Sequence, residues 1–318
     1  MERRRLDCPA PVDLALTCGP LVRGRRDPAH LLSRSELWRA TNTPDGSATV
    51  HAVVLAADRA IEVEAWGAGA GWSIAHADGM LGLLDADDFV CDHPVVRRAQ
   101  RFAPGLRMCA TGALIDVLLP TIIDQRVTGV EAKRTWFGLT RALGEPAPGP
   151  VALRVPPHPD RIAALSDYER RRFGIEARRG AALVSAARDA RRLQRAAVRG
   201  SQVLQRALLS LAGVGPWTAA SVAQVVCGDA DAVAVGDWHL PRIVGCALAD
   251  EPRADDARML ELLEPFRPHR ARVVRLLAAA AMGPARTAPR AEIPDLLGRE
   301  VRGERDFRVR RSLRLREH

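Results

Sequence analysis

The chain has 318 residues, of which 47% are hydrophobic, and it carries a formal net charge of +9 at pH 7. This length is typical of two domains, and the apolar content suffices for a buried core. The sequence contains no run of about eighteen uncharged apolar residues and no signal-like apolar stretch near its N-terminus, which excludes a membrane-spanning protein and predicts a cytoplasmic one.

The positive charge predicts a polyanionic partner, because basic surfaces attract nucleic acids through their phosphates. Among the 47 basic residues only Lys133 is a lysine. Arginine cannot be deprotonated to act as an amine nucleophile, so Schiff-base chemistry has only Lys133 and the N-terminal amine available to it. The six cysteines include no Cys-x-x-Cys pair, which favours reduced thiols over a disulfide framework or a zinc site.

The first 90 residues predict an antiparallel sheet with a helix packed on it. The expected strands alternate in polarity or are rich in strand-forming residues, and they cover residues 12–16, 37–41, 48–55 and 61–66. Residues 72–83 have apolar positions that suggest a helix on that sheet, and Trp38, Trp66 and Trp72 are expected in the core. No catalytic pattern is evident in this part of the chain.

From His93 to about residue 281 the pattern is helical, apart from a proline-rich loop at residues 143–159. The acidic run at residues 85–88 marks a domain boundary. The many arginines of residues 160–197 are typical of a solvated basic helix, and phosphate contact is the alternative. Beyond residue 284, ten arginines and few apolar residues predict a basic, partly disordered tail. The expected fold is mainly α, with an N-terminal α+β domain (1–90), a helical domain (91–284) and the tail (285–318).

The stretch from Leu204 to residue 226 predicts two helices joined by a tight hairpin. Leucines at helical spacing end at Gly213, Val214 and Gly215, and the glycines allow positive φ and close approach of another backbone. Pro216 suits the first position of the second helix, where free backbone N–H groups attract anions. This hairpin, extended by Thr218, is a candidate phosphate-binding element; alone, such a pattern is also typical of a structural turn.

Asp237 lies about twenty residues beyond the hairpin and directly precedes a run of helical periodicity that includes Leu240, Ile243 and Val244. Asp237 is therefore expected to open a helix. An aspartate in this position is typical of an N-cap, and it is equally a carboxylate placed near a candidate anion site.

The order Leu-x-Gly-Val-Gly-Pro-Trp-Thr-Ala, a short connector and Val-Gly-Asp resembles the helix-hairpin-helix DNA glycosylase superfamily, in particular its 3-methyladenine DNA glycosylase II family. The resemblance implies a helical glycosylase core after an antiparallel sheet domain. Trp217 stands where another branch has a lysine, which implies a monofunctional enzyme. Only Cys246 follows Asp237, so the iron–sulfur cluster of some members, and with it any cofactor, is not expected.

Residues 101–107 and 114–128 resemble the family's FPGLR segment and its helix and turn beside the flipped nucleotide. Gln125 and Arg126 fall on this turn, and the resemblance places the residue that wedges into the duplex at Arg126; contact with phosphate or solvent is the alternative. The implied base pocket consists of Trp217, Trp238, Phe266 and Ser221. In this pocket Ser221 replaces a second aromatic residue, and Phe266 replaces a tryptophan.

The resemblance implies that the protein flips alkylated purines out of damaged double-stranded DNA and hydrolyses their N-glycosidic bond. Asp237 would stabilise the oxocarbenium ion and activate water, while a cationic leaving base needs no general acid. Two alternatives stay open, namely a catalytically retired DNA-binding protein that senses damage and a glycosylase for oxidised or deaminated bases. The expected enzyme is a bacterial, nucleoid-associated monomer without membrane contact.

Overall fold

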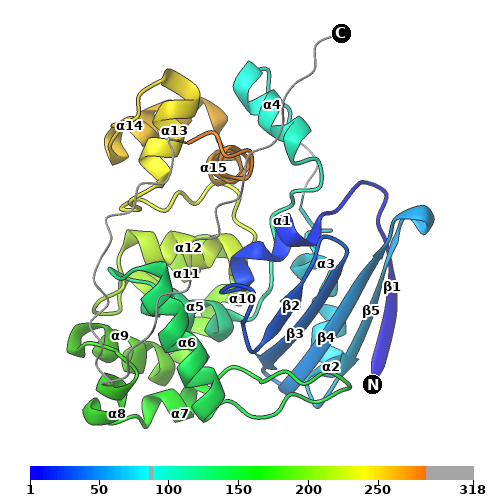
Figure 1. Ribbon diagram of the computed structural model, residues 1–318, viewed down its shortest axis with the longest axis vertical. Coiled ribbons are helices and arrows are strands. Elements are labelled where there is room, and N and C mark those ends of the chain that lie inside the picture. Colours follow the sequence, from blue (N-terminus) through cyan, green and yellow to red (C-terminus); the bar gives the residue numbers. More distant parts are fainter. Residues whose placement is uncertain (86–88, 284–318) are drawn as a thin grey trace, which may run out of the picture. The chain divides into compact units, whose positions relative to one another are not determined.

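The computed structural model describes residues 1–85 and 89–283. The predicted tail at 285–318 and most of the acidic boundary at 85–88 lie outside the described residues. Figure 1 shows an N-terminal antiparallel sheet beside a larger set of helices. The expected mainly α fold with an N-terminal α+β part is therefore confirmed.

Five antiparallel strands form the sheet in the order β1-β5-β4-β3-β2. Their bounds are Glu2–Asp7 (β1), His30–Leu32 (β2), Glu36–Thr43 (β3), Gly46–Leu55 (β4) and Ala60–Trp66 (β5). In β5, Ile61, Val63 and Ala65 are buried, whereas Glu62 and Glu64 between them are partly exposed. This period of two gives the sheet one apolar face, against which the short helices α2 (Ala70–Ala75) and α3 (Ala77–Met80) and the helical part pack.

The predicted strand at residues 12–16 is wrong, because Leu14–Cys18 forms helix α1. The carboxylate of Asp13 accepts a hydrogen bond from the Leu16 N–H at 3.1 Å, and this local bond favours a helix start over an extended chain. The first strand is instead β1, whose Glu-Arg-Arg-Arg sequence lacks the usual strand formers.

The three N-terminal tryptophans are partly exposed, so their predicted core positions are wrong. Trp38 stacks on the ring of His51 with 3.8 Å between centroids, and the rings of Trp38 and Trp66 are 5.6 Å apart. Trp72 stacks on His76. These aromatic side chains therefore pack on one another near the surface instead of filling the interior.

Twelve further helices are described after the sheet. They are α4 (Pro94–Phe102), α5 (Leu114–Ile123), α6 (Gly129–Leu143), α7 (Pro159–Ala163), α8 (Asp167–Arg172), α9 (Ala177–Arg188), α10 (Ala190–Val198), α11 (Ser201–Leu209), α12 (Pro216–Val226), α13 (Leu240–Ala249), α14 (Asp256–Leu263) and α15 (Arg270–Ala279), and three-residue 3-10 turns occupy Gly19–Leu21, Ala56–Asp58 and Glu264–Phe266. The proline-rich loop at residues 143–159 is confirmed. The arginine-rich segment 160–197 forms four helices rather than one.

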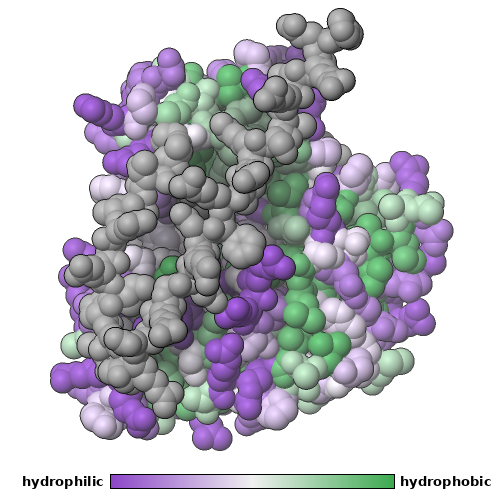
Figure 2. Space-filling view, viewed as in Figure 1, coloured by the Kyte–Doolittle hydropathy of each residue, from purple (hydrophilic) through white to green (hydrophobic). Residues whose placement is uncertain are grey.

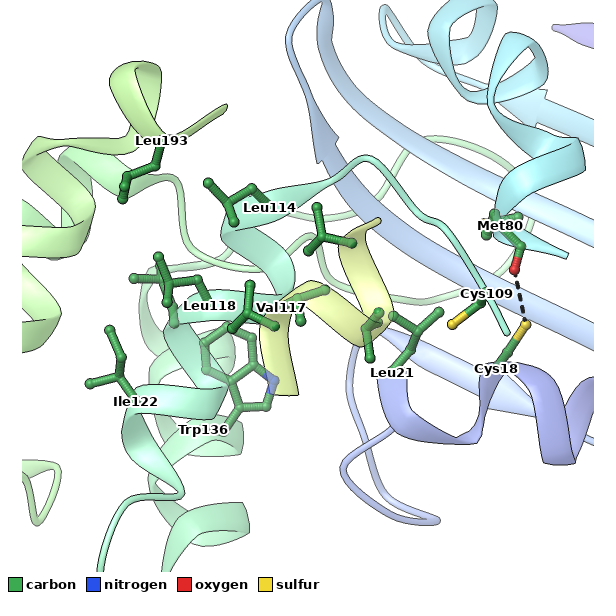
Figure 3. Close-up of a cluster of buried hydrophobic side chains, with 14 of the residues drawn as sticks. Cys18, Leu21, Met80, Cys109, Leu114, Val117, Leu118, Ile122, Trp136 and Leu193 are labelled. Atoms are coloured by element: carbon green, nitrogen blue, oxygen red, sulfur yellow. Dashed lines mark hydrogen bonds between the residues drawn. The ribbon is translucent and has the colours of Figure 1, made fainter. Parts of the chain in front are cut away.

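Helix α5 runs through the centre of the main core. Leu114, Leu118 and Ile122 recur one turn apart along it and are fully buried (Figure 3). The ring of Trp136 from α6 packs beside them. The same buried cluster contains Leu37 of β3, so the sheet shares one core with α5 and the helices packed around it.

A buried carboxylate fixes α5 to the sheet. Asp116 accepts hydrogen bonds from the Thr41 hydroxyl at 2.5 Å and from the Asn42 N–H at 2.9 Å. It also lies 3.8 Å from the guanidinium of Arg39, which is only 2% exposed. Burial lowers the pKa of Arg39, and the negative charge of Asp116 opposes this shift. The position of α5 is thus set by polar contacts as well as by apolar packing.

On the face shown in Figure 2, hydrophilic and hydrophobic side chains are interspersed. Within residues 1–85 and 89–283, no helix combines the length and the apolar content needed to cross a membrane.

Candidate functional site

Helices α11 and α12 enclose the hairpin predicted from the glycine pattern. Gly213 has φ +85°, and a Cβ atom there would lie 2.9 Å from the Cβ of Ala182, so only glycine fits. Val214 is 6% exposed and anchors the turn in the core. Gly215 is extended at φ −106°, so only one of the two glycines uses positive φ, contrary to expectation. A Cβ at Gly215 would meet no described atom within 4 Å, which leaves this side of the turn open.

Backbone donors are free at the start of α12. Pro216 occupies the first turn of the helix, as predicted, and the described part of the chain offers no acceptor to the N–H groups of Gly215 and Trp217. Free N–H groups at a helix N-terminus attract anions. The side chain of Thr218 does not extend this donor set, because Thr218 is 1% exposed and its hydroxyl accepts a hydrogen bond from Gln125.

The turn after α5 meets the hairpin through Gln125. Its side-chain amide donates to the Gly213 carbonyl at 3.1 Å and to the Thr218 hydroxyl at 2.8 Å. Arg126, the next residue, is exposed and has φ +55°, a backbone conformation that costs a non-glycine residue about 1 kcal/mol. The two residues predicted for the flipping turn therefore differ: Gln125 binds the hairpin, and Arg126 presents its side chain to solvent.

An ion pair supports this turn from the N-terminal part of the chain. Arg23 donates to Asp124 at 2.8 Å. Burial raises the pKa of Asp124, while the positive charges of Arg23 and Lys133 oppose the increase. The Lys133 amine lies 3.6 Å from the position that a Cβ of Gly24 would take. This ion pair has no local sequence pattern, since Arg23 and Asp124 are 101 positions apart.

Asp237 lies in the turn before α13, and three N–H groups donate to its carboxylate. Oδ1 accepts from the backbone of His239 at 2.7 Å and of Leu240 at 3.0 Å, while Oδ2 accepts from the indole Nε1 of Trp217 at 2.9 Å. The sequence predicts that Asp237 opens a helix directly; α13 begins three residues later, at Leu240, and Asp237 binds its first N–H. Asp237 thus binds the start of α13 from two residues before its N-cap, His239, and its carboxylate is half-buried.

The loop before Asp237 is held in place by two acidic residues, Asp256 and Asp231. No sequence pattern singled them out. Both oxygens of Asp256, in the first turn of α14, accept from the N–H of Gly236, at 3.1 and 3.0 Å. Asp231 accepts from the guanidinium of Arg270 at 2.7 and 2.9 Å. Burial alone would raise the pKa of Asp231, but the hydrogen bonds and charge of Arg270 outweigh it, and the pKa is lowered.

The predicted pocket residues do not form one group. Ser221 lies one turn after Trp217 on the same face of α12 and is partly exposed. Trp238 is 64% exposed, and the guanidinium of Arg242 lies 4.7 Å from its ring centroid. Phe266 is 9% exposed and belongs to a buried cluster that joins α4 to α13, α14 and α15. Phe266 also lines a cavity of about 580 Å³ together with Phe89 and His93, and its role in base binding stays a prediction.

All six cysteines are free thiols. Across residues 1–85 and 89–283, no three His, Cys, Asp or Glu side chains are grouped so that they could hold a metal ion. Burial raises the pKa of the Cys227 thiol to about 11. The expected lack of a cofactor stays a prediction.

The fold is similar to solved DNA glycosylases, although no protein-family model and no curated protein matches the sequence. The 3-methyladenine DNA glycosylase from Archaeoglobus fulgidus superposes with a TM-score of 0.72 at 18% identity, over 89% of this chain and 98% of that one. The 8-oxoguanine glycosylase/lyase of Clostridium acetobutylicum in its apo form gives a TM-score of 0.62 at 12% identity, over 88% and 96% of the two chains. Its complex with double-stranded DNA containing cytosine opposite 8-oxoguanine gives 0.61 at 13% identity, over 86% and 92%. The chain therefore has the fold of the helix-hairpin-helix DNA glycosylases.

Proposed function

We propose that this protein is a base-excision repair DNA glycosylase that removes alkylated purines of the 3-methyladenine type from double-stranded DNA. One observation carries the proposal: Asp237, held by three N–H groups, is joined through Trp217 to a hairpin with free backbone donors, within a glycosylase fold. A fixed anion beside a phosphate-binding element suits a reaction that builds positive charge on a DNA sugar.

In the proposed reaction the free N–H groups of Gly215 and Trp217 bind a backbone phosphate. Arg126, exposed on its turn, fills the gap that the flipped nucleotide leaves, which offsets part of the cost of unstacking. The bond between C1′ and the base then breaks, and its electron pair neutralises the cationic base. Asp237 stabilises the resulting oxocarbenium ion and accepts the proton of the water that attacks C1′.

The chemistry proposed is monofunctional. A lyase step requires an amine that attacks C1′, and arginine cannot supply one. The single lysine, Lys133, is on α6 and lies beside Gly24. The side chain hydrogen-bonded to Asp237 is instead that of Trp217. We expect the protein to act as a monomer in the bacterial cytoplasm, on the nucleoid, without a cofactor.

The decisive experiment is incubation of the protein with methylated duplex DNA and measurement of free 3-methyladenine. Asp237→Asn should reduce release by at least about a hundredfold, because it removes the charge that the transition state needs. Asp160→Asn, whose side chain is 89% exposed, is the matched control and should keep full activity. Unchanged release by Asp237→Asn would exclude the proposed mechanism.

An oxidised-base substrate is the second candidate, favoured by the similarity to an 8-oxoguanine glycosylase/lyase. Base release from a panel of duplexes with one lesion each, including 8-oxoguanine, distinguishes an alkylated-purine substrate from an oxidised-base substrate. Borohydride trapping of a protein–DNA adduct that disappears in Lys133→Ala would establish a lyase. Tight binding to an abasic-site analogue without release of any base would instead indicate a damage sensor.

A further inference from the structure

We propose that Trp217 is a positioning residue for Asp237 and that it acts through its indole N–H. This inference rests on the proposed glycosylase function and extends it. It assigns to Trp217 a role separate from stacking on a flipped base, because the indole edge is bonded to the carboxylate.

The two oxygens of Asp237 are held from different parts of the chain. The backbone N–H groups of His239 and Leu240 bind Oδ1, and Trp217 Nε1 binds Oδ2 at 2.9 Å. The terminal torsion of an aspartate is broad, so bonds to one oxygen leave the plane of the carboxylate loosely defined. Among the described residues Trp217 is the one donor to Oδ2. Its bond therefore defines the plane that the carboxylate presents.

The indole is a suitable anchor because its nitrogen can only donate and the acceptor is a carboxylate. Trp217 also packs, as Leu240 does, against a small cluster of alanines, which restricts rotation of the indole ring. The alanines of this cluster are Ala220, Ala223, Ala232 and Ala234. The donor is thus held in place by packing as well as by the bond it makes.

Trp217 also takes part in the phosphate-binding element. Its backbone N–H is one of the free donors at the start of α12, directly after Pro216. One residue therefore joins the proposed phosphate contact to the carboxylate: its main chain faces the anion site, and its side chain orients Asp237. Substituting the side chain should leave the backbone donor, and hence DNA binding, in place.

The test is Trp217→Phe, which keeps an aromatic ring and removes the N–H. We expect the single-turnover rate of base release to fall about tenfold, because the plane of the carboxylate is no longer fixed, while Kd for an abasic-site duplex changes less than twofold. The matched control is Trp38→Phe, which removes an indole N–H bonded to the Glu36 carboxylate at 3.0 Å in the sheet. It should leave both quantities unchanged.

A second measurement does not depend on activity. The indole ¹H–¹⁵N NMR signal of Trp217, identified by its loss in Trp217→Phe, should shift upfield in Asp237→Ala, because the hydrogen bond to the carboxylate is lost. An unmoved signal, or a Trp217→Phe rate within twofold of the unaltered protein, would overturn the positioning role alone. If the unaltered protein releases no base from any lesion, the proposed function fails, and this role fails with it.

Discussion

The side-chain amide of Gln125 donates to the carbonyl of Gly213 at 3.1 Å, although the two residues are 88 positions apart in the sequence. The same amide reaches the Thr218 hydroxyl at 2.8 Å. The turn that presents Arg126 and the hairpin with its free backbone donors therefore form one surface. Their separation is set by Gln125.

Gln125→Ala should lower the free energy of unfolding by about 1–2 kcal/mol, because the buried Thr218 hydroxyl and the Gly213 carbonyl both lose a donor. Urea denaturation measures this difference. Gln202→Ala, on the exposed side of α11, is the control and should change stability by less than about 0.5 kcal/mol. Equal losses in both variants would show that the amide does not join the two turns.

The hairpin glycines should respond differently to alanine. In Gly213→Ala, an alanine must adopt positive φ and its Cβ atom lies too close to the side chain of Ala182. We therefore expect the free energy of unfolding to fall by more than about 1 kcal/mol. Gly215→Ala should leave stability nearly unchanged, since the described residues leave open the space that its Cβ would occupy. It should instead weaken binding to damaged and undamaged duplexes alike, measured by fluorescence anisotropy. A loss limited to one lesion would contradict a phosphate-binding role for Gly215.

Arg126 has a strained backbone conformation, and its side chain is the proposed wedge. Arg126→Gly should be about 1 kcal/mol more stable than Arg126→Ala, because glycine adopts φ +55° without cost. Both variants should release base from duplex DNA more slowly than the unaltered protein. Arg134→Ala removes one positive charge from the exposed side of α6 and controls for electrostatic attraction. Equal rates for Arg126→Ala and Arg134→Ala would assign to Arg126 only a charge effect.

The ion pair between Asp231 and Arg270 should make the stability of the protein depend on pH. The pKa of Asp231 is lowered in the folded protein, so its ion pair with Arg270 contributes stability above the ordinary aspartate pKa of about 4 and loses it as the pH falls through the folded value. Asp231→Asn should therefore be less stable than the unaltered protein at pH 7, and the difference should shrink in acid. Urea denaturation between about pH 3 and pH 7 tests this. A difference independent of pH would show that the charge of Asp231 contributes nothing.

The sequence was sufficient for features that depend on neighbouring residues. The hairpin, the proline that starts α12 and the position of Asp237 before a helix all follow from local turn and capping chemistry. Strand β5 follows from the alternation of apolar and acidic residues between Ile61 and Ala65. The same rules fail at residues 12–16, where the cap at Asp13 outweighs the alternation.

The partners of these residues could not be predicted from the sequence, because they are set by packing between distant segments. Gln125 binds the hairpin, and Asp256 holds the residue before Asp237, yet neither contact has a local pattern. The burial of Phe266, in contrast, does have a local pattern in the sequence. Met259, Leu263 and Phe266 fall at helical spacing, which is typical of a buried stripe.

The contact of Asp116 with β3 has a consequence for how this fold can be divided. Helix α5 connects that carboxylate at its start to the Gln125 turn at its end. Removing the sheet would leave Asp116 without partners and would expose the helix residues that share a buried cluster with Leu37 of β3. The N-terminal part is therefore a structural component of the site and not a detachable module. A minimal protein made from the helices alone would lack the contact between Asp116 and β3. The position of Arg126 relative to the hairpin would then no longer be fixed from the start of α5.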